Sequence, residues 1–347
     1  MNLEDSGARA LLQAAEAFGL DVDHKRTTWK TNHVARVETR DGLAYAVKHF
    51  RSPALAARES SILVHLANAD LACGIQTLHL CTNRDALATT DLGPMMASQW
   101  IEGASKPYRQ IDAEGWRQLG RALASLHQAL VSYRGETHES LSTSLQALAI
   151  ESERTRIASD RQALQAIAAP SEALALQDAK LHLLESHLVP CMATWPTLTP
   201  QLLHNDYNVH NYLFDTGGAL SVIDWDRCVL APREYEVVRC LNHLPLESPG
   251  FAAAFLAGYT ERAVLDRDLL KWAVHASMLS HASKHWPNEL ALAGAPGALE
   301  RLVALEPMVS RLAHGEGMLL SFFQDSGSTK GSLPTSGSTK DSAPTKN

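Results

Sequence analysis

The segment 204–226 constrains this chain more than any other part of its sequence. His204, Asp206 and Asn211 form the pattern H-x-D-x-x-x-x-N, and Asp224 follows after a short apolar run. A loop with unrelated polar residues would explain any one of these positions. It does not explain their occurrence together, at this spacing, within one short stretch.

The residues between Asn211 and Asp224 predict a β-hairpin. Residues 212–214 are a short apolar strand, 215–218 carry the Asp and Gly residues that form tight turns, and 220–223 are a returning β-rich run. A tight hairpin brings its two ends together. We therefore expect the oxygen atoms of Asn211 and Asp224 to face one site.

These side chains suit phosphoryl transfer. That reaction needs an acidic group beside the attacking hydroxyl and oxygen ligands that hold Mg²⁺ against the phosphates of a nucleotide. Asp206 supplies the acidic group, while Asn211 and Asp224 supply ligands of the kind that Mg²⁺ prefers, completed by phosphates and water. A zinc or iron site built from His204, Asp206 and His210 is an alternative. Because no cysteine or further histidine lies nearby at ligand spacing, magnesium is favoured.

The order and spacing of this segment resemble the catalytic loop and metal-binding aspartate of the protein-kinase-like fold. His204-Asn205, in place of histidine–arginine, is similar to the small-molecule branch of that fold, the aminoglycoside phosphotransferase and choline kinase group. The resemblance implies that Asp206 orients the acceptor hydroxyl and accepts its proton, and that His204 supports the loop through hydrogen bonding. It assigns Asn211 and Asp224 to the metal.

A kinase-like site also needs a lysine on a strand and a glutamate on the following helix. Lys48 lies in the strand-like run 44–50, and Glu59 lies on a predicted helix from about 53 to 68. Taken singly, a strand lysine or a helix glutamate is commonly a solvated surface charge. Together with the 204–226 segment, they are predicted to form an ion pair that grips the nucleotide phosphates.

Two further segments are assigned to the nucleotide. Residues 27–33 occupy the place of the phosphate-covering loop but contain no glycine, unlike protein kinases; Thr28 and Thr31 are the expected phosphate contacts. The apolar stretch around Gln99 and Ile101 is expected to connect the lobes and to bind adenine through its backbone, although it would also pass for a buried strand.

We predict an α+β, bilobal protein-kinase-like fold: a small β-rich nucleotide-binding lobe over 1–101, and a mainly helical lobe over 102–324 with the catalytic loop and acceptor pocket. The repeated Ser, Gly, Thr, Lys and Pro of 325–347 predict a disordered tail. Further strands are expected at 75–82 and 94–101. Helices are expected near 3–20, 110–131, 139–169, 171–188, 232–244, 249–263, 266–286 and 298–321.

Composition limits the possible partners. The net charge of −7, without a basic block, argues against nucleic acid and mildly favours neutral or cationic substrates. The five cysteines are scattered and odd in number, which indicates reduced thiols. No signal peptide or membrane span is expected, so the predicted location is the cytoplasm.

The predicted function is therefore an ATP- or GTP-dependent, Mg²⁺-dependent phosphotransferase. Its expected acceptor is a small molecule with a hydroxyl group: an aminoglycoside-like antibiotic, an amino alcohol or a sugar. The segment 223–226 with 230–232 resembles antibiotic kinases of the spectinomycin type. The alternatives are a non-catalytic nucleotide-binding module and a protein kinase. The second is disfavoured because the Ala-Pro-Glu motif is missing. Oligomeric state is not determined by the sequence.

Some neighbouring residues carry open roles. Asp226 assists the metal, contacts substrate, or is structural. His127, on the predicted helix 110–131, is expected to be structural. Glu236 lies where the resembling family often has an aspartate that buttresses the site. The charges of Glu234, Glu236, Asp266 and Asp268 could attract a cation, but the favoured interpretation is that they are solvated helix charges.

Overall fold

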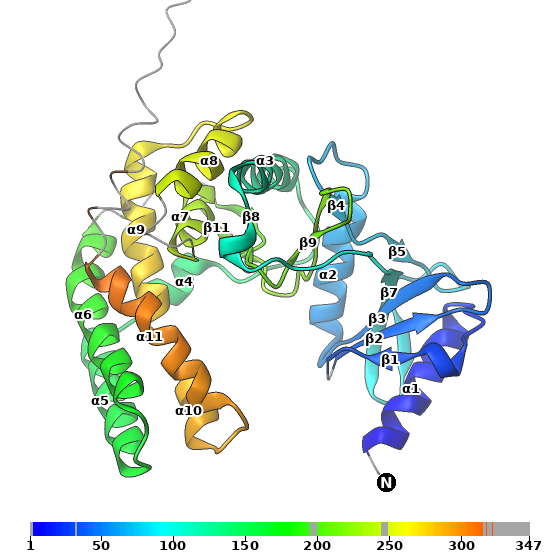
Figure 1. Cartoon of the computed structure of the whole chain (residues 1–347), viewed down its shortest axis with the longest axis horizontal. Coiled ribbons are helices and arrows are strands. Elements are labelled where there is room, and N and C mark those ends of the chain that lie inside the picture. The colour runs from blue at the N-terminus through cyan, green and yellow to red at the C-terminus, as the bar shows by residue number, and fades with distance from the viewer. Residues whose placement is uncertain are drawn as a thin grey trace, which may run out of the picture.

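The computed structural model describes residues 3–31, 33–193, 195, 200–243, 249–314, 317 and 321. The chain forms two lobes, with the N-terminal sheet on one side and most helices on the other (Figure 1). The predicted bilobal α+β fold is confirmed. The tail predicted from residue 325 lies outside the described residues.

The N-terminal lobe is an antiparallel sheet with the order β1-β2-β3-β7-β5, and β6 pairs with β7. Alternation explains its core: along β2, Ala35 and Val37 are fully buried, whereas their neighbours are partly exposed. The elements of this lobe are α1 (Leu3–Ala17), a 3₁₀ turn (His24–Arg26), β1 (Thr28–Trp29), β2 (Val34–Glu38), β3 (Ala44–His49), β5 (Leu78–His79), β6 (Ala88–Thr90) and β7 (Gly93–Gln99).

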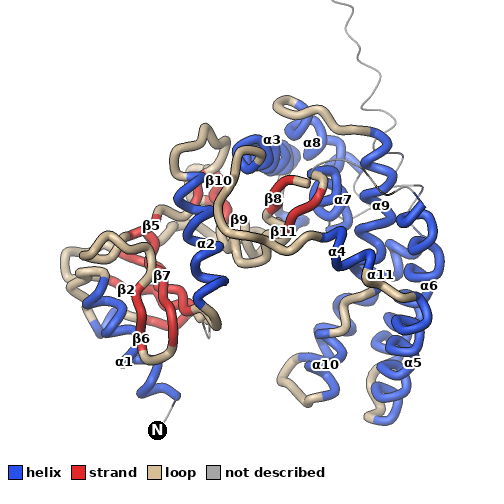
Figure 2. Tube along the Cα trace, turned by 180° about the vertical axis from the view of Figure 1, so that it is seen from behind, coloured by secondary structure: helices blue, strands red, loops and turns tan. Residues whose placement is uncertain are grey.

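The C-terminal lobe is mainly helical, and Figure 2 shows from behind that one small strand pair lies among its helices and a second lies toward the N-terminal lobe. Its helices are α3 (Ala113–Leu130), α4 (Leu141–Gln146), α5 (Ile150–Ala166), α6 (Ser171–Ala193), α7 (Arg233–His243), α8 (Pro249–Thr260), α9 (Arg267–Ala282), α10 (Trp286–Leu292) and α11 (Ala298–His314), and a 3₁₀ turn (Tyr108–Gln110) precedes α3. β8 (Gln201–Leu203) pairs with β11 (Val229–Ala231), and β9 (Tyr212–Phe214) pairs with β10 (Leu220–Val222).

Helix α2 (Pro53–Leu66) connects the two lobes. Its start follows local rules: the Ser52 side chain accepts the Leu55 N–H, and Pro53 occupies the first turn. Its buried apolar residues belong to the hydrophobic core of the helical lobe, and a separate, smaller core lies between α1 and the sheet. His65 also hydrogen-bonds to the Ala129 carbonyl on α3 at 2.8 Å. The helix that carries Glu59 is thus fixed to the C-terminal lobe.

The structure differs from the predicted elements in detail. The strand expected at 75–82 is two short strands, β4 (Gly74–Ile75) and β5, because β4 leaves the N-terminal sheet and pairs in parallel with β10. The helix expected at 266–286 ends at Ala282, and α10 begins at Trp286; that expected at 139–169 is divided into α4 and α5. The predicted lobe boundaries stay predictions.

The structure also bears on the expectations about membrane-spanning helices and about the cysteines. Among the described residues, no helix combines the length and apolar character that crossing a membrane requires. All five cysteines are described, and each has a free thiol.

Candidate active site

The β9–β10 hairpin brings together the two residues that its sequence places at its ends. Phe214 lies opposite Leu220, and the Ile223 N–H donates to the Asn211 carbonyl at 3.1 Å. Asn211 and Asp224 therefore line the same cavity. The predicted convergence of these two side chains is what the structure shows.

The loop before the hairpin is held by its own side chains. The Asp206 N–H donates to His204 Nδ1 at 3.2 Å, so the ring proton is on Nε2, which donates to the Ile223 carbonyl at 3.0 Å. The Asn211 amide donates to the Asp206 carbonyl at 2.8 Å and to its Oδ2 at 2.9 Å. His204 is thus a structural support of the loop, as the resemblance implies, and both of its ring nitrogens are engaged.

Glu236 on α7 anchors this loop from below. Its buried carboxylate accepts the backbone N–H groups of His204, at 3.1 Å, and of Asn205. His127 Nε2 on α3 lies 2.9 Å from Glu236 Oε2, and His127 Nδ1 lies 2.8 Å from the Tyr259 hydroxyl. Burial raises the pKa of Glu236, but its contacts with His127, His204 and Asn205 outweigh burial and leave that pKa below its ordinary value.

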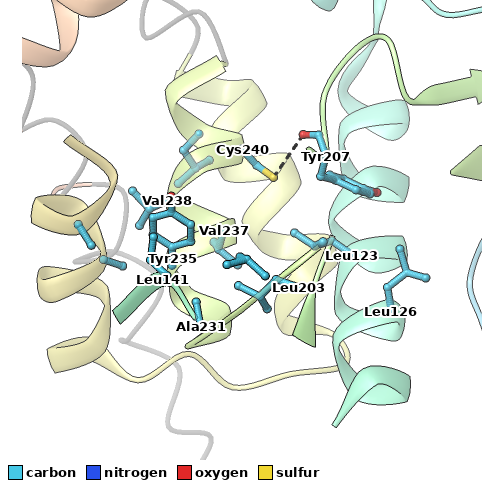
Figure 3. Close-up of a cluster of buried hydrophobic side chains, with 14 of the residues drawn as sticks. Leu123, Leu126, Leu141, Leu203, Tyr207, Ala231, Tyr235, Val237, Val238 and Cys240 are labelled. Atoms are coloured by element: carbon cyan, nitrogen blue, oxygen red, sulfur yellow. Dashed lines mark hydrogen bonds between the residues drawn. The ribbon is translucent and has the colours of Figure 1, made fainter. Parts of the chain in front are cut away.

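The helices around this anchor are tightly packed. Figure 3 shows apolar residues of α7, including Tyr235 and Val237, packed with Leu123 of α3 and Leu203 of β8. β8 ends at Leu203, directly before the loop. The loop therefore starts from a rigid core rather than from a mobile surface.

Lys48 on β3 reaches across to the same site. Its Nζ lies 2.7 Å from Glu59 Oε2, 2.5 Å from Asp224 Oδ1 and 4.0 Å from Asp226 Oδ2. Burial lowers the pKa of Lys48, but the three carboxylates outweigh burial and raise that pKa above its ordinary value. The predicted Lys48–Glu59 pair is present, and its charge is fixed at neutral pH.

Backbone strain concentrates at this site. Asn205 and Asp224 both have positive φ, +61° and +69°, a conformation that costs a residue with a side chain about 1 kcal/mol or more. The Gln76 side chain, which the sequence did not indicate, accepts the Asp224 N–H at 3.1 Å. Such strain persists where the surroundings fix it, and it is typical of functional positions.

A cavity of about 440 Å³ lies between the lobes, within the range of small-molecule sites. It is lined by Lys30, Thr31, His33, Val34, Ala46, Lys48, Gln76, Ser98, Gln99, Trp100, Ile101, His210, Asn211, Leu213, Ile223, Asp224 and Asp226. Apolar side chains and the connecting segment 98–101 lie among these residues, so a planar base could bind there while phosphates face Lys48.

Three of the four residues predicted to contact the nucleotide in the covering loop and the connecting segment line the cavity, and Thr28 does not. Gln99 and Ile101 line the cavity. Thr31 also lines it, but its hydroxyl accepts the N–H groups of His33 and Val34 and so shapes the loop. Thr28 lies on β1, is exposed to solvent, and is not among the residues that line the cavity.

The donor atoms fit magnesium. The Asn211 NH₂ group is used by Asp206, which leaves the amide oxygen for an ion, and Asp224 offers a carboxylate in the same cavity. This pair of one carboxylate and one amide leaves the remaining ligand positions of the ion to phosphates and water. A site made by protein ligands alone is not found: among the described residues, no three or more His, Cys, Asp or Glu side chains are grouped so that they could hold a metal. The alternative site of His204, Asp206 and His210 also loses His204, whose two nitrogens are bonded within the loop.

Comparison with known proteins agrees with this geometry. Residues 30–272 match the model of the phosphotransferase enzyme family. No curated protein matches the sequence. Similar solved structures include an aminoglycoside phosphotransferase from Alicyclobacillus acidocaldarius (14% identity, TM-score 0.59), covering 94% of this chain and 96% of that one.

A second is the spectinomycin phosphotransferase APH(9)-Ia in complex with ADP and spectinomycin (15% identity, TM-score 0.61), covering 90% of this chain and 98% of that one. A third is the amicoumacin kinase hAmiN in complex with AMP-PNP, Ca²⁺ and Ami (14% identity, TM-score 0.63), covering 90% of this chain and 96% of that one. At these identities the structures show a shared fold. The family match spans well over half of the sequence and includes the catalytic loop, the hairpin and Lys48. The chain belongs to the phosphotransferase enzyme family.

Proposed function

We propose that this protein transfers the γ-phosphoryl group of ATP or GTP to a hydroxyl group of a small molecule. One observation carries the proposal. Lys48, Asn211 and Asp224 line a single cavity, and the Asp206 carboxylate is hydrogen-bonded to Asn211 at its edge. A nucleotide-binding fold without catalysis would not require Asp206 at that place.

Each of these residues has its own role in the proposed phosphoryl transfer. Asp206 orients the acceptor hydroxyl and accepts its proton as the new bond from oxygen to the γ-phosphorus forms. The bond from that phosphorus to the bridging oxygen breaks, and the nucleoside diphosphate leaves. Lys48, positioned by Glu59, stabilises the charge of the phosphates. Asn211 and Asp224 would hold Mg²⁺, which supplies charge neutralisation on the triphosphate.

The similar structures support the choice of nucleotide and acceptor. The spectinomycin phosphotransferase binds ADP and spectinomycin, and the amicoumacin kinase binds AMP-PNP and Ca²⁺. A further similar structure, the aminoglycoside phosphotransferase APH(2")-IIIa, binds GDP and kanamycin. We extend nucleotide use and a small hydroxyl acceptor from those proteins to this chain. The odd, scattered cysteines support a reducing, cytoplasmic location.

The test compares the wild-type chain with Asp206→Ala and with Thr28→Ala, whose exposed side chain lies outside the cavity. Nucleoside diphosphate release would be measured with a panel of hydroxyl compounds, and nucleotide affinity with a fluorescent analogue. We expect Asp206→Ala to lower turnover by about 10²- to 10⁴-fold with nearly unchanged nucleotide affinity, and Thr28→Ala to lower it little. Unchanged turnover in Asp206→Ala would refute the assignment, and nucleotide binding without any transfer would favour the non-catalytic module.

A further inference from the structure

The loop between β1 and β2 uses its backbone N–H groups for its own fold. Glycine-rich phosphate loops instead hold phosphate through such N–H groups. Here the N–H groups of Lys30 and Thr31 donate to the Val34 carbonyl at 2.8 and 3.3 Å. Those of His33 and Val34 donate to the Thr31 hydroxyl at 3.1 and 3.0 Å. Of the described residues from 30 to 34, each therefore has its N–H group engaged within the loop and not free for a phosphate.

The register of the sheet places Lys30 in line with Lys48. The last ladder pair between β1 and β2 is Trp29 with Ala35, so the next pair is Lys30 with Val34, which are joined by the hydrogen bond given above. Val34 lies opposite Lys48 of β3. Residues directly opposite each other in antiparallel strands project to the same face. Lys30, Val34 and Lys48 thus form one row across three strands, with about 10 Å between the backbones of the two lysines.

This row faces the cavity between the lobes. Lys30, Val34 and Lys48 all line it, together with Asn211 and Asp224. Among the described residues that line this cavity, Lys30 and Lys48 are the only lysines, and none is an arginine. A group that is bound against Asn211 and Asp224 therefore has one lysine near it on β3 and a second on the loop that covers the cavity.

The two lysines differ in their partners. Lys48 Nζ lies 2.7 Å from Glu59 Oε2 and 2.5 Å from Asp224 Oδ1, so carboxylates of the protein already offset its charge. Lys30 is exposed to solvent, and within the described part of the chain it forms no ion pair. An exposed lysine is commonly a solvated surface charge. Lys30 differs from such a residue because it lines the cavity and lies in one row with Lys48.

The charge of the nucleotide calls for a second cation. A triphosphate remains negative after one Mg²⁺ has bound to it, and the carboxylates of Asp224 and Asp226 add negative charge to the cavity. Lys48 faces these carboxylates as well as the place of the phosphates. A lysine ammonium on its flexible stem binds phosphate as a point charge. A second cation near the phosphates is therefore stabilising, and Lys30 is placed to supply it.

We propose that Lys30 binds the β- or γ-phosphate of the nucleotide, so that the covering loop holds the phosphates through a side chain instead of its backbone. The proposal rests on the proposed function and names a further phosphate-binding residue of that site. Lys30 and Lys48 hold the phosphate chain between them. The lack of glycine in 27–33 agrees with this mode, because a long side chain makes a close approach of the backbone unnecessary.

The test measures nucleotide affinity and needs no phosphate transfer. Lys30→Met removes the charge and keeps much of the side-chain length, whereas Lys30→Arg keeps the charge. Lys25→Met makes the same change in charge at another exposed lysine of this lobe, one that does not line the cavity. Calorimetry would give the Kd of AMP-PNP and GMP-PNP with Mg²⁺, and that of adenosine and guanosine, which carry no phosphate. Melting temperatures check that each variant is folded.

The expected loss is confined to ligands with phosphates. Lys30→Met should weaken the binding of AMP-PNP or GMP-PNP, whichever the wild-type chain binds more tightly, by about 10-fold, the contribution of one hydrogen bond between charged groups. The Kd of the matching nucleoside should stay the same. Lys30→Arg should recover most of the lost affinity, and Lys25→Met should bind the nucleotide as the wild-type chain does.

Three results would overturn the proposal. The first is unchanged affinity for both triphosphate analogues in Lys30→Met. The second is an equal loss in Lys25→Met, because the net charge of the lobe and not a contact would then be the cause. The third is an equal loss for the nucleoside, because a changed loop shape would then explain it.

Failure of the proposed function gives a different result. In that case the wild-type chain would bind the nucleotide with an affinity that depends on Lys30, and it would transfer phosphate to no hydroxyl compound. Phosphate transfer by the wild-type chain, together with unchanged nucleotide affinity in Lys30→Met, would overturn the role of Lys30 and leave the proposed function in place.

Discussion

A single carboxylate fixes the catalytic loop at the scale of the residue. Glu236 accepts two adjacent backbone N–H groups, those of His204 and Asn205, at the point where Asn205 has positive φ. The N–H groups would otherwise be buried without acceptors, which costs about 1–3 kcal/mol each. Glu236 therefore stabilises the strained backbone that positions Asp206.

We expect Glu236→Ala to lower the free energy of unfolding by about 3 kcal/mol and kcat by at least about 10²-fold, because the loop loses its acceptors. Glu236→Asp should recover part of both. Urea denaturation and steady-state kinetics measure the two effects. Glu234→Gln on the same helix is the control, since Glu234 accepts the Asp266 N–H away from the loop. If Glu234→Gln and Glu236→Ala lowered kcat equally, Glu236 would have no special role.

Sequence reasoning found the residues whose linear spacing carries the chemistry. Asp206, Asn211 and Asp224 lie in one segment, so a motif and a hairpin were enough to bring them together. Gln76 and Arg239 were missed because only tertiary packing brings them to the site. Asp206 and Arg239 line one small pocket because α7 packs against the loop, and no local pattern marks that proximity.

At the scale of the element, two glycines set the distance between α3 and α8. A Cβ added to Gly120 would lie 1.9 Å from the Phe255 carbonyl oxygen, and one added to Gly258 would lie 2.0 Å from the Arg117 carbonyl oxygen. Backbone cannot give way as a flexible side chain does. The helices are close enough for His127 of α3 to reach both Tyr259 of α8 and Glu236.

Gly120→Ala should therefore separate α3 from α8 and lower the free energy of unfolding by about 3 kcal/mol. Because His127 lies two turns further along α3, the same change should lower kcat. Gly250→Ala is the matched control on α8, since a Cβ there meets nothing within 4 Å. Thermal unfolding and kinetics of both variants check this; equal melting temperatures for the two would contradict it.

Helices α6 and α9 meet at a histidine pair that makes stability depend on pH. His187 Nδ1 and His275 Nδ1 are 2.9 Å apart, so one donates and the other accepts. Burial, and then the neighbouring His275 and His182, lower the pKa of His187 to about 4. The unfolded chain therefore binds more protons than the folded one between pH 6.5 and 4, and the stability contributed by neutral His187 is lost as pH falls through this range.

We expect His187→Gln to remove up to about 3 kcal/mol of the decline in unfolding free energy between pH 6.5 and 4. Glutamine keeps a hydrogen-bonding group beside His275 but does not titrate. Urea denaturation at pH 7, 5.5 and 4.5 measures both proteins. Because many carboxylates also titrate in this range, the difference between the two curves is the relevant quantity. Parallel curves would show that His187 does not titrate in this way.

The elements themselves were largely predictable where periodicity is strong. Helix α3 follows a regular apolar stripe and lies almost where it was expected. The strand expected at 75–82 was not found as one element, because β4 pairs with β10 of the other lobe rather than continuing the N-terminal sheet. Pairing between residues so distant in sequence depends on the assembled lobes and leaves no local pattern.

At the scale of the whole molecule, the border between the two cores passes through the Lys48–Glu59 pair. Lys48 belongs to the N-terminal sheet, whereas Glu59 lies on α2, whose apolar residues are part of the C-terminal core. The small core between α1 and the sheet is separate. Motion of the sheet relative to α2 would break this ion pair, and a nucleotide that contacts both Lys48 and Asp224 would oppose such motion.

This arrangement predicts where a bound nucleotide protects the backbone. With Mg²⁺ and a non-hydrolysable nucleotide at about 100 times its Kd, amides that exchange through opening of the N-terminal sheet should be protected by about 2.7 kcal/mol, or about 100-fold in rate. Amides in α3, α7 and α9 should change much less, because their core is built mainly from helices and includes few residues of the sheet, such as Met96 of β7. Hydrogen–deuterium exchange read by mass spectrometry resolves the two regions. Asp224→Asn should reduce the Mg²⁺-dependent part of the protection, since the amide keeps the shape but loses the charge. Protection spread evenly over both lobes would mean that the two cores open as one unit.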